Sequence, residues 1–257
     1  MLETIETAAI AAIAKEAGDA IMEIYRRDFT VEYKEDQSPL TEADLAANAI
    51  IVEALKPFGL PILSEEGKSV PYETRKGWES YWCVDPIDGT KEFIKKNDEF
   101  TVNIALVHRG VPVMGVVYAP ALGEMYSAKR GEGAFKNGAR LPLHTNETPE
   151  VSLHIVASKS HLSAETQAFI DAVAQTTQRI EQVSRGSSLK LCMVAEGAAD
   201  LYPRLAPTME WDTAAADAVV RESGKMTYRY DAEAEMGGDM PLEYNKEDLL
   251  NPWFVVR

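Results

Sequence analysis

The residues most able to do chemistry form the acidic turn Asp85-Pro86-Ile87-Asp88-Gly89-Thr90. Because proline and glycine restrict the turn, its two carboxylates and a free backbone carbonyl can converge on a hard cation, which prefers oxygen ligands. An ordinary acidic turn with a capping aspartate is the alternative, and it would be the better interpretation of an isolated Asp-x-x-Asp-Gly. The metal hypothesis therefore depends on further acids elsewhere in the chain.

Three further acidic positions could complete such a site. Glu65 has Glu66 beside it and follows an apolar run, although an exposed pair of glutamates means little alone. Asp44 stands three residues after Thr41, so it could serve a site or complete a helix-capping box. Asp212 stands at the start of a predicted helix, where it could be the N-cap or a metal ligand. The local sequence leaves these alternatives open.

The acids follow segments that are predicted to be strands. Residues 60–63 and 81–84 are short apolar runs, and each leads directly into carboxylates. In layered α/β proteins, sites lie at the carboxyl ends of strands. Two strands that deliver acids at their ends are the arrangement expected for a metal cluster.

Two helices are predicted before the first of these strands. The first helix has an apolar stripe at helical spacing, formed by Ile10, Ile13, Ala17, Ile21 and Ile24. The second helix begins after Thr41 and ends at Pro57 and Gly59. Its apolar side is expected to include Leu45, Ile51, Val52 and Leu55.

The remaining elements argue against a purely parallel sheet. A run of hairpin strands is predicted at 102–108, 113–119 and 124–128, with a tight turn at Asn137-Gly138. Another short strand is expected at 30–33. The second half alternates, with strands at 153–157 and 199–202 and helices at 164–174, 187–195 and 212–222. This order favours mixed or antiparallel sheets covered by helices.

Composition excludes several classes of protein. The chain has 257 residues, an ordinary apolar fraction of 46% and a net charge of −15, which does not suit a nucleic-acid polymer as partner. We expect Cys83 and Cys192 to be buried free thiols, which suits a reducing cytoplasm. The N-terminus lacks the basic start of a signal peptide, and no apolar run reaches the roughly 20 residues that span a bilayer. A cytoplasmic location is predicted, and peripheral association with the cytoplasmic face of the inner membrane is left open.

Three motifs together give the chain a recognisable pattern. They stand in the order Leu63-Ser64-Glu65-Glu66-Gly67, then Trp82 to Thr90, then Trp211-Asp212-Thr213-Ala214-Ala215. This pattern resembles the lithium-sensitive, Mg²⁺-dependent phosphatases of the inositol monophosphatase superfamily. Within it, the bacterial 3'(2'),5'-bisphosphate nucleotidases are most similar, on the segments 88–94, 100–106, 186–190, 202–204 and 250–252. The resemblance covers nearly the whole chain.

The resemblance implies a role for each matching residue. Two Mg²⁺ ions, with a third weakly held cation as an alternative, would be bound by Glu65, Asp85, Asp88, Asp212 and the carbonyl of Ile87. Glu65 would also take part in catalysis, and Asp44 and Thr90 would orient the attacking water. Substrate contacts would come from these metal-site residues (Glu65, Ile87, Asp88, Thr90, Asp212) and from Gly89, His161, Ser187, Ser188, Lys190 and Arg204. A surface position for His161 and solvated charges for Lys190 and Arg204 are the plainer alternatives.

The resemblance also implies the fold and the reaction. The fold would be a layered αβαβα sandwich with mixed, largely antiparallel sheets. An N-terminal half (1–140) would carry most metal ligands, and a C-terminal half (141–257) would carry Asp212 and substrate contacts. The substrate would be a small phosphorylated nucleotide, adenosine 3',5'-bisphosphate, which loses its 3'-phosphate to give AMP. A sugar-phosphate or inositol phosphatase and a non-catalytic metal or nucleotide sensor are the alternatives. The oligomeric state is left open.

Overall fold

The centre of the molecule is a seven-stranded sheet with the order β3-β4-β5-β6-β7-β8-β9. The computed structural model describes residues 4–33, 39–145, 152–157, 163–176 and 179–257. The strands of this sheet are β3 (Ile62–Ser64), β4 (Ser80–Asp88), β5 (Thr101–His108), β6 (Val111–Ala119), β7 (Glu124–Lys129), β8 (Gly133–Lys136) and β9 (Ala139–Arg140). Only β3 and β4 run parallel, and the other pairs are antiparallel. The predicted run of hairpins is therefore confirmed.

The parallel pair β3 and β4 places acids at one edge of the sheet. Ser64 is in register with Val84, so Glu65, the residue after β3, lies beside Asp85 in the last part of β4. The ladder continues one step further, because the Glu65 N–H donates to the Val84 carbonyl at 3.1 Å. The predicted delivery of acids by two neighbouring strand ends is confirmed for Glu65 and Asp85.

An irregularity in β4 turns its two aspartates to the same side. Asp85 pairs with Asn103 of β5, and Asp88 pairs with Thr101, so three steps on β4 oppose two on β5. In a regular strand, residues three apart point to opposite faces. The one extra residue, which acts as a β-bulge, brings both aspartates to the face shared by Asn103 and Thr101.

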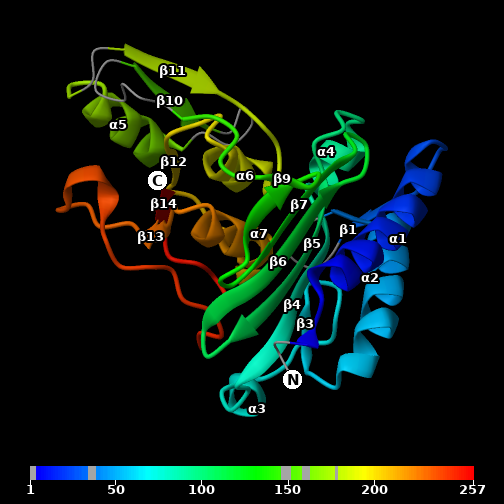
Figure 1. Cartoon of the computed structure of the whole chain (residues 1–257). Coiled ribbons are helices and arrows are strands. Elements are labelled where there is room, and N and C mark those ends of the chain that lie inside the picture. Colours follow the sequence, from blue (N-terminus) through cyan, green and yellow to red (C-terminus); the bar gives the residue numbers. More distant parts are fainter. Residues whose placement is uncertain (1–3, 34–38, 146–151, 158–162, 177–178) are drawn as a thin grey trace.

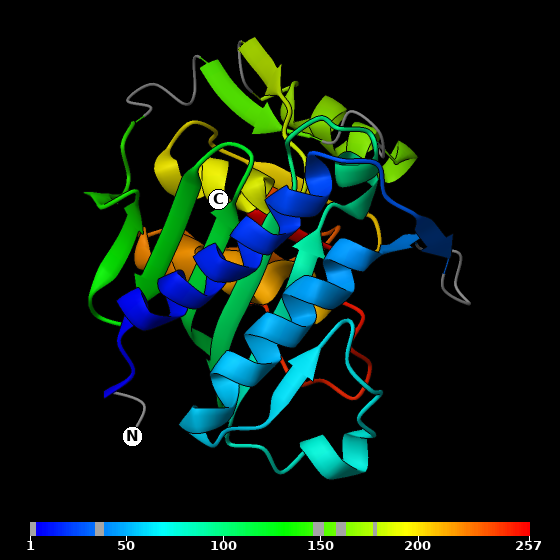
Figure 2. The same ribbon diagram turned by 90° about the vertical axis from the view of Figure 1, so that its right-hand side faces the viewer.

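One face of the sheet is covered by α1 (Thr7–Tyr25) and α2 (Glu42–Leu55), which lie side by side across it (Figure 2). The apolar stripe of α1 is buried as predicted, apart from Ile13, which is half-buried. The prediction for α2 was partly wrong, because Leu45 is 51% exposed and Val52 is half-buried. Instead Ala43, Ala47, Ile51 and Leu55 face the core, where the two alanines allow close packing.

The opposite face is covered by α6 (Leu189–Glu196) and α7 (Glu210–Glu222) (Figure 1). The contact between α7 and the sheet is closest at Gly115 of β6. A Cβ atom there would lie 2.1 Å from the carbonyl oxygen of Ala215, so only glycine fits. Cys83 and Cys192 are buried free thiols in this layer, as predicted.

Two smaller groups of strands lie on the far side of these helices (Figure 1). The helix α5 (Ala164–Val173) packs against them through Ile170 and Val173. The strand β10 (Ser152–Val156) pairs in parallel with β11 (Arg179–Val183). The other group has the order β12-β14-β13 and comprises β12 (Tyr202–Arg204), β14 (Phe254–Val256) and β13 (Thr227–Arg229). A bridge between Ile155 and Leu201 connects the two groups. The layered αβαβα sandwich with mixed sheets is confirmed.

The other elements are short. They are β1 (Val31–Tyr33), β2 (Pro39–Thr41), α3 (Tyr72–Arg75), α4 (Thr90–Ile94) and the 3₁₀ turns 56–58 and 235–237. The strand expected at 199–202 begins at Tyr202. The elements β2, α3, β11, β13 and β14 were missed. Among the described residues, no helix has the length and apolar character to cross a bilayer. The division at residue 140 stays a prediction.

Candidate metal centre

Three carboxylates from distant parts of the chain converge at the edge where β3 and β4 end. Glu65 follows β3, Asp85 lies near the end of β4, and Asp212 is in the first turn of α7. Each offers an oxygen, and these oxygens lie within 4.8 Å of one another. Asp212 is not the N-cap considered from the sequence. It is the third residue of α7, and its carboxylate accepts a hydrogen bond from the Met209 N–H at 2.8 Å.

The cluster holds more negative charge than a protein interior tolerates alone. Burial raises the pKa of Asp85 well above its usual value, and the neighbouring Glu65, Asp88 and Asp212 raise it further. Burial and Asp88 raise the pKa of Asp212 to about 8. A donor set of carboxylate oxygens, with Asp85 buried and Glu65 and Asp212 partly buried, fits a hard divalent cation such as Mg²⁺, which would offset this repulsion.

Asp88 and Ile87 border the same centre. Both line a cavity of about 260 Å³ together with Glu65, Asp85 and Asp212. Asp88 lies outside the closest group of three carboxylates, and its Oδ2 accepts a 2.5 Å hydrogen bond from the Ser188 hydroxyl. Burial raises the pKa of Asp88, and this hydrogen bond acts in the opposite direction. The expected ligand roles of Asp88 and of the Ile87 carbonyl stay predictions, as do those of the three clustered carboxylates.

Asp44 caps α2 and also contacts Thr90. Its Oδ2 accepts hydrogen bonds from the backbone N–H of Thr41 at 2.7 Å and from the Thr41 hydroxyl at 2.6 Å, which caps α2. Its Oδ1 lies 3.3 Å from Oγ1 of Thr90. The Thr90 hydroxyl is also 3.3 Å from the Ile87 carbonyl. One carboxylate therefore caps the helix with one oxygen and contacts Thr90 with the other, and its expected role in orienting water stays a prediction.

A second cavity of about 360 Å³ adjoins the first and shares Asp88, Gly89 and Asp212 with it. Lys190 and Arg204 line it. Lys190 is only 6% exposed, and burial lowers its pKa to about 8. Its Nζ donates to the Ser187 carbonyl at 2.8 Å, so the side chain is held beside the cavity. Glu65 and Asp85 thus line only the first cavity, and Lys190 and Arg204 line only the second.

The two serines of the second cavity differ in their surroundings. The Ser188 hydroxyl accepts from Asn103 Nδ2 at 2.8 Å and lies 2.8 Å from the Asp212 carbonyl, besides its contact with Asp88. It is 1% exposed and therefore supports Asp88, although it also lines the cavity. The contact of Asn103 with Ser188 was not predicted, because nothing in the sequence of its strand distinguishes this residue from any other polar residue. Ser187 borders the cavity with a left-handed backbone (φ 46°).

The remaining expected contacts are Gly89 and His161. Gly89 has a φ of 93°, and a Cβ there would lie 3.2 Å from the Glu99 carbonyl oxygen, so glycine is required before α4. His161 lies outside the described residues. Lys91 and Glu92 line both cavities and were not among the predicted contacts.

A layered fold with a carboxylate centre at its strand ends is the arrangement expected of a metal-dependent phosphatase. The model of the inositol monophosphatase family matches residues 1–251. The chain is 43% identical over 252 residues to the 3'(2'),5'-bisphosphate nucleotidase CysQ of Escherichia coli strain K12, covering 95% of this chain and 96% of that protein. The CysQ structure from Bacteroides thetaiotaomicron matches with a TM-score of 0.87 and 45% identity, covering 99% and 98% of the two chains. The chain belongs to the inositol monophosphatase family.

The raised pKa values of Asp85 and Asp212 predict how stability depends on pH. Between about pH 4 and pH 8 the folded state binds more protons at these groups than the unfolded state, so the metal-free protein should lose stability as pH rises. Mg²⁺ at about 100-fold above its pH 8 dissociation constant should therefore stabilise the protein by about 3 kcal/mol at pH 8. The same concentration should stabilise it less at pH 5, where protonated carboxylates bind the cation more weakly. Thermal unfolding in EDTA and in Mg²⁺ measures both effects. A Mg²⁺-induced gain that is equal at the two pH values would contradict the assignment.

Proposed function

We propose that this protein is a Mg²⁺-dependent, Li⁺-sensitive 3'(2'),5'-bisphosphate nucleotidase. The reaction would hydrolyse the 3'-phosphate of adenosine 3',5'-bisphosphate to give AMP and phosphate. The observation that carries the proposal is the pair of joined cavities, one rich in carboxylates and one containing Lys190 and Arg204. A substrate with two phosphates needs two different anion sites, and the cavities supply both. The nucleotidase names of the relatives support the same substrate class.

The scissile phosphate would lie at the carboxylate cavity. Glu65, Asp85, Asp88, Asp212 and the Ile87 carbonyl would hold two Mg²⁺ ions, and a third is the alternative. When bound, these ions would neutralise phosphate charge and activate water. The chain's own contribution would be to orient that water. The Thr90 hydroxyl donates toward Asp44 at 3.3 Å, which leaves its lone pairs to accept a hydrogen bond from the water. Water would add to phosphorus as the bond to the ribose oxygen breaks, and the proton that the water loses would be balanced by protonation of the leaving ribose oxygen.

The non-scissile phosphate would lie in the cavity with Lys190 and Arg204. A phosphate held away from the metal ions needs cationic partners of its own, because the carboxylates repel it. Lys190 is suited to this task, since its ammonium group is already largely stripped of water and is held beside the cavity by backbone carbonyls. Ser187 and Gly89, both of which line this cavity, would complete the substrate contacts.

A substrate panel tests the proposal directly. Purified protein with Mg²⁺ should release phosphate from adenosine 3',5'-bisphosphate faster than from inositol 1-phosphate or sugar phosphates, and Li⁺ should inhibit the release. Faster hydrolysis of inositol 1-phosphate would favour the sugar-phosphate alternative. A bound but unchanged nucleotide after long incubation with Mg²⁺ would favour a sensor. We also propose a cytoplasmic location, which suits the unpaired thiols, and the peripheral membrane association stays a prediction.

Replacing Lys190 by methionine should reduce the preference for a bisphosphorylated substrate. The ratio of kcat/KM for adenosine 3',5'-bisphosphate to that for 3'-AMP should fall about 10- to 100-fold, because a charge-assisted contact of about 1.5–3 kcal/mol to the second phosphate is lost. Steady-state kinetics on the two nucleotides gives this ratio. Lys190→Arg keeps the charge and is the control. An unchanged ratio in Lys190→Met would show that Lys190 does not contact the second phosphate.

A further inference from the structure

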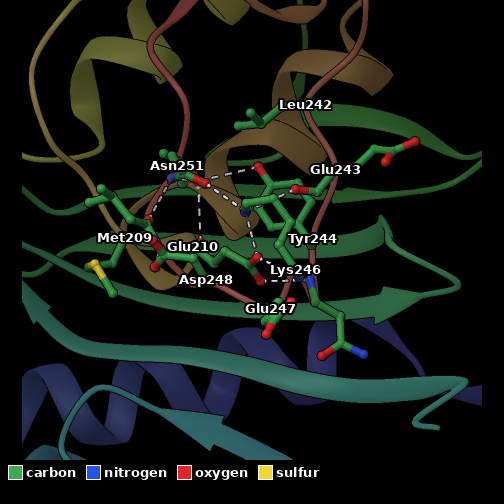
Figure 3. A network of polar contacts seen from close by, with 12 residues as sticks. Met209, Glu210, Leu242, Glu243, Tyr244, Lys246, Glu247, Asp248 and Asn251 are labelled. Carbon is green, nitrogen blue, oxygen red and sulfur yellow. Dashed lines mark hydrogen bonds and ion pairs between the residues drawn. The ribbon is translucent and has the colours of Figure 1, made fainter. Parts of the chain in front are cut away.

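A buried carboxylate that lines neither cavity lies next to the metal centre. Glu210 is the first residue of α7, two positions before Asp212, and it is fully buried. Its Oε2 accepts from the Asn245 N–H at 2.7 Å, and its Oε1 accepts from the Lys246 N–H at 3.0 Å and from Lys246 Nζ at 2.5 Å. Figure 3 shows Glu210 and Lys246 pointing toward each other. All three donors belong to one C-terminal segment.

The same carboxylate reaches the strand that supplies the other acids. The Tyr81 hydroxyl lies 3.4 Å from Oε2 of Glu210. Tyr81 is on β4, four residues before Asp85, and packs in the core cluster between the sheet and α7. Glu210 thus contacts both the element that carries Asp85 and the segment that anchors the start of α7.

Asn251 fixes the turn that precedes α7. Its side-chain amide donates to the Met209 carbonyl at 2.7 Å and to Thr213 Oγ1 at 3.0 Å, and its backbone N–H donates to the Thr208 carbonyl at 2.8 Å. Figure 3 shows Asn251 beside Met209, with Lys246 and Glu210 below it. Because Met209 in turn donates its N–H to Asp212, Asn251 holds the backbone that orients the Asp212 carboxylate.

Arg75 holds the C-terminal segment from its other side. This arginine is 2% exposed, and its guanidinium donates to the Asn245 side chain at 3.1 Å, to the Lys246 carbonyl at 2.5 Å and to the Glu247 carbonyl at 2.7 Å. Residues 245–247 are therefore fixed between α3 and α7. A segment held on two sides can fix the position of the helix end that it contacts.

We propose that Glu210 and Lys246 are positioning residues for the metal centre. Together they set the place of Asp212 relative to the end of β4, without touching metal or substrate. Neither residue is among the described residues that line the two cavities. A packed apolar side chain would suffice to seat a helix on the sheet. Glu210 instead accepts hydrogen bonds from Lys246 and from the backbone, and it contacts Tyr81. These directional contacts fix one orientation of the start of α7, as groups around metal ligands generally fix the orientation of the ligands. The inference rests on the proposed metal-dependent function.

Two variants and a matched control test this inference. In Glu210→Gln one oxygen becomes an NH₂ group that faces backbone donors, and in Lys246→Gln the charge that faces Glu210 is removed. Both should weaken Mg²⁺ binding about 10- to 100-fold, measured by titration calorimetry, and should reduce the Mg²⁺-induced rise in Tm. At saturating Mg²⁺ the KM for adenosine 3',5'-bisphosphate should change less than about 3-fold, since no substrate contact is lost.

Glu196→Gln is the matched control. It removes a similar carboxylate, bonded to Lys136 at 2.7 Å and Tyr126 at 3.1 Å, but at the far end of α6. It should lower Tm and leave Mg²⁺ affinity unchanged.

The outcomes separate the inference from the proposed function. Wild-type Mg²⁺ affinity in folded Lys246→Gln, whose lysine is partly exposed and whose loss the fold should tolerate, overturns the positioning role. The same affinity loss in Glu196→Gln also overturns it, because general destabilisation would then be the cause. If wild-type protein binds Mg²⁺ but releases no phosphate from the bisphosphate, the proposed function fails, while the affinity comparison still decides the positioning role.

Discussion

The Asp85→Asn variant is expected to lose phosphatase activity by at least about 10³-fold, while its metal-free form unfolds at a higher temperature than the metal-free wild type. Losing a metal ligand removes several kcal/mol of transition-state stabilisation, and each 1.36 kcal/mol is tenfold in rate. Asp85 is 1% exposed among Glu65, Asp88 and Asp212, so the amide also removes a buried like charge. The amide oxygen of the variant can still accept the hydrogen bond that Asp85 Oδ1 accepts from the Ile87 N–H at 3.0 Å. Phosphate release and calorimetry in EDTA measure the two effects.

Asp217→Asn is the matched control for the gain in stability. Asp217 is also a fully buried aspartate, but its Oδ2 accepts from Arg221 at 2.9 Å and from the Tyr244 hydroxyl at 3.1 Å. Removing a charge that has a buried partner should lower Tm, whereas Asp85→Asn should raise the Tm of the metal-free protein. For a chain of this size, 1 kcal/mol corresponds to roughly 2–4 °C. A metal-free Asp85→Asn protein that is destabilised like Asp217→Asn would show that Asp85 is not under charge repulsion.

The Thr90→Val variant is expected to lower kcat by about 10²- to 10⁴-fold with little change in Mg²⁺ affinity. Valine keeps the branched shape but has no hydroxyl to accept from water or to donate toward Asp44 and the Ile87 carbonyl. A group that orients and helps deprotonate the nucleophile usually contributes in this range. Steady-state kinetics at saturating Mg²⁺ should show the loss in kcat, with KM nearly constant.

Two companion variants make the assignment of Thr90 specific. Thr90→Ser keeps the hydroxyl and should retain much of the activity. Asp44→Asn should also lower kcat, because an amide NH₂ group that faces Thr90 reverses the direction of the hydrogen bond. Its carbonyl oxygen can still accept from Thr41, so stability should stay within about 1 kcal/mol of wild type. Near-normal turnover in Thr90→Val would exclude Thr90 from the chemistry.

The sequence was a good guide to the parts of the site that depend on local rules. The turn predicted at 85–90 is instead the last part of β4, which runs to Asp88, and the start of α4. Glu65 follows the neighbouring strand β3, so the rule for strand ends still brings these acids together. The capping relation of Asp44 to Thr41 was also readable, since a capping box has a fixed spacing. The periodic spacing of apolar residues also located α1 and the hairpin strands, because this spacing is likewise a local property of the sequence.

Other features depend on contacts between distant segments and left no local signal. Leu45 looked apolar enough for the core, but the docking angle of α2 buries Ala43 and Ala47 instead. The strands β13 and β14 are three residues long, too short to show periodicity. Asn103 and Glu210 are ordinary polar residues in the sequence. Their buried contacts, with Ser188 for Asn103 and with Tyr81 and Lys246 for Glu210, join segments that are far apart in the chain. The family resemblance supplied the roles that spacing alone could not.

The place of Asp212 on a late helix has a consequence for the order of folding. The ligand cluster needs α7, which docks on the central sheet where Gly115 meets Ala215. A ribosome-bound chain that ends before residue 210 has only part of the cluster, so Mg²⁺ cannot guide its early collapse. The cation should instead act after docking, as a lock that slows unfolding and leaves the folding rate nearly unchanged. Mg²⁺ would then stabilise newly made protein through slower unfolding rather than through faster folding.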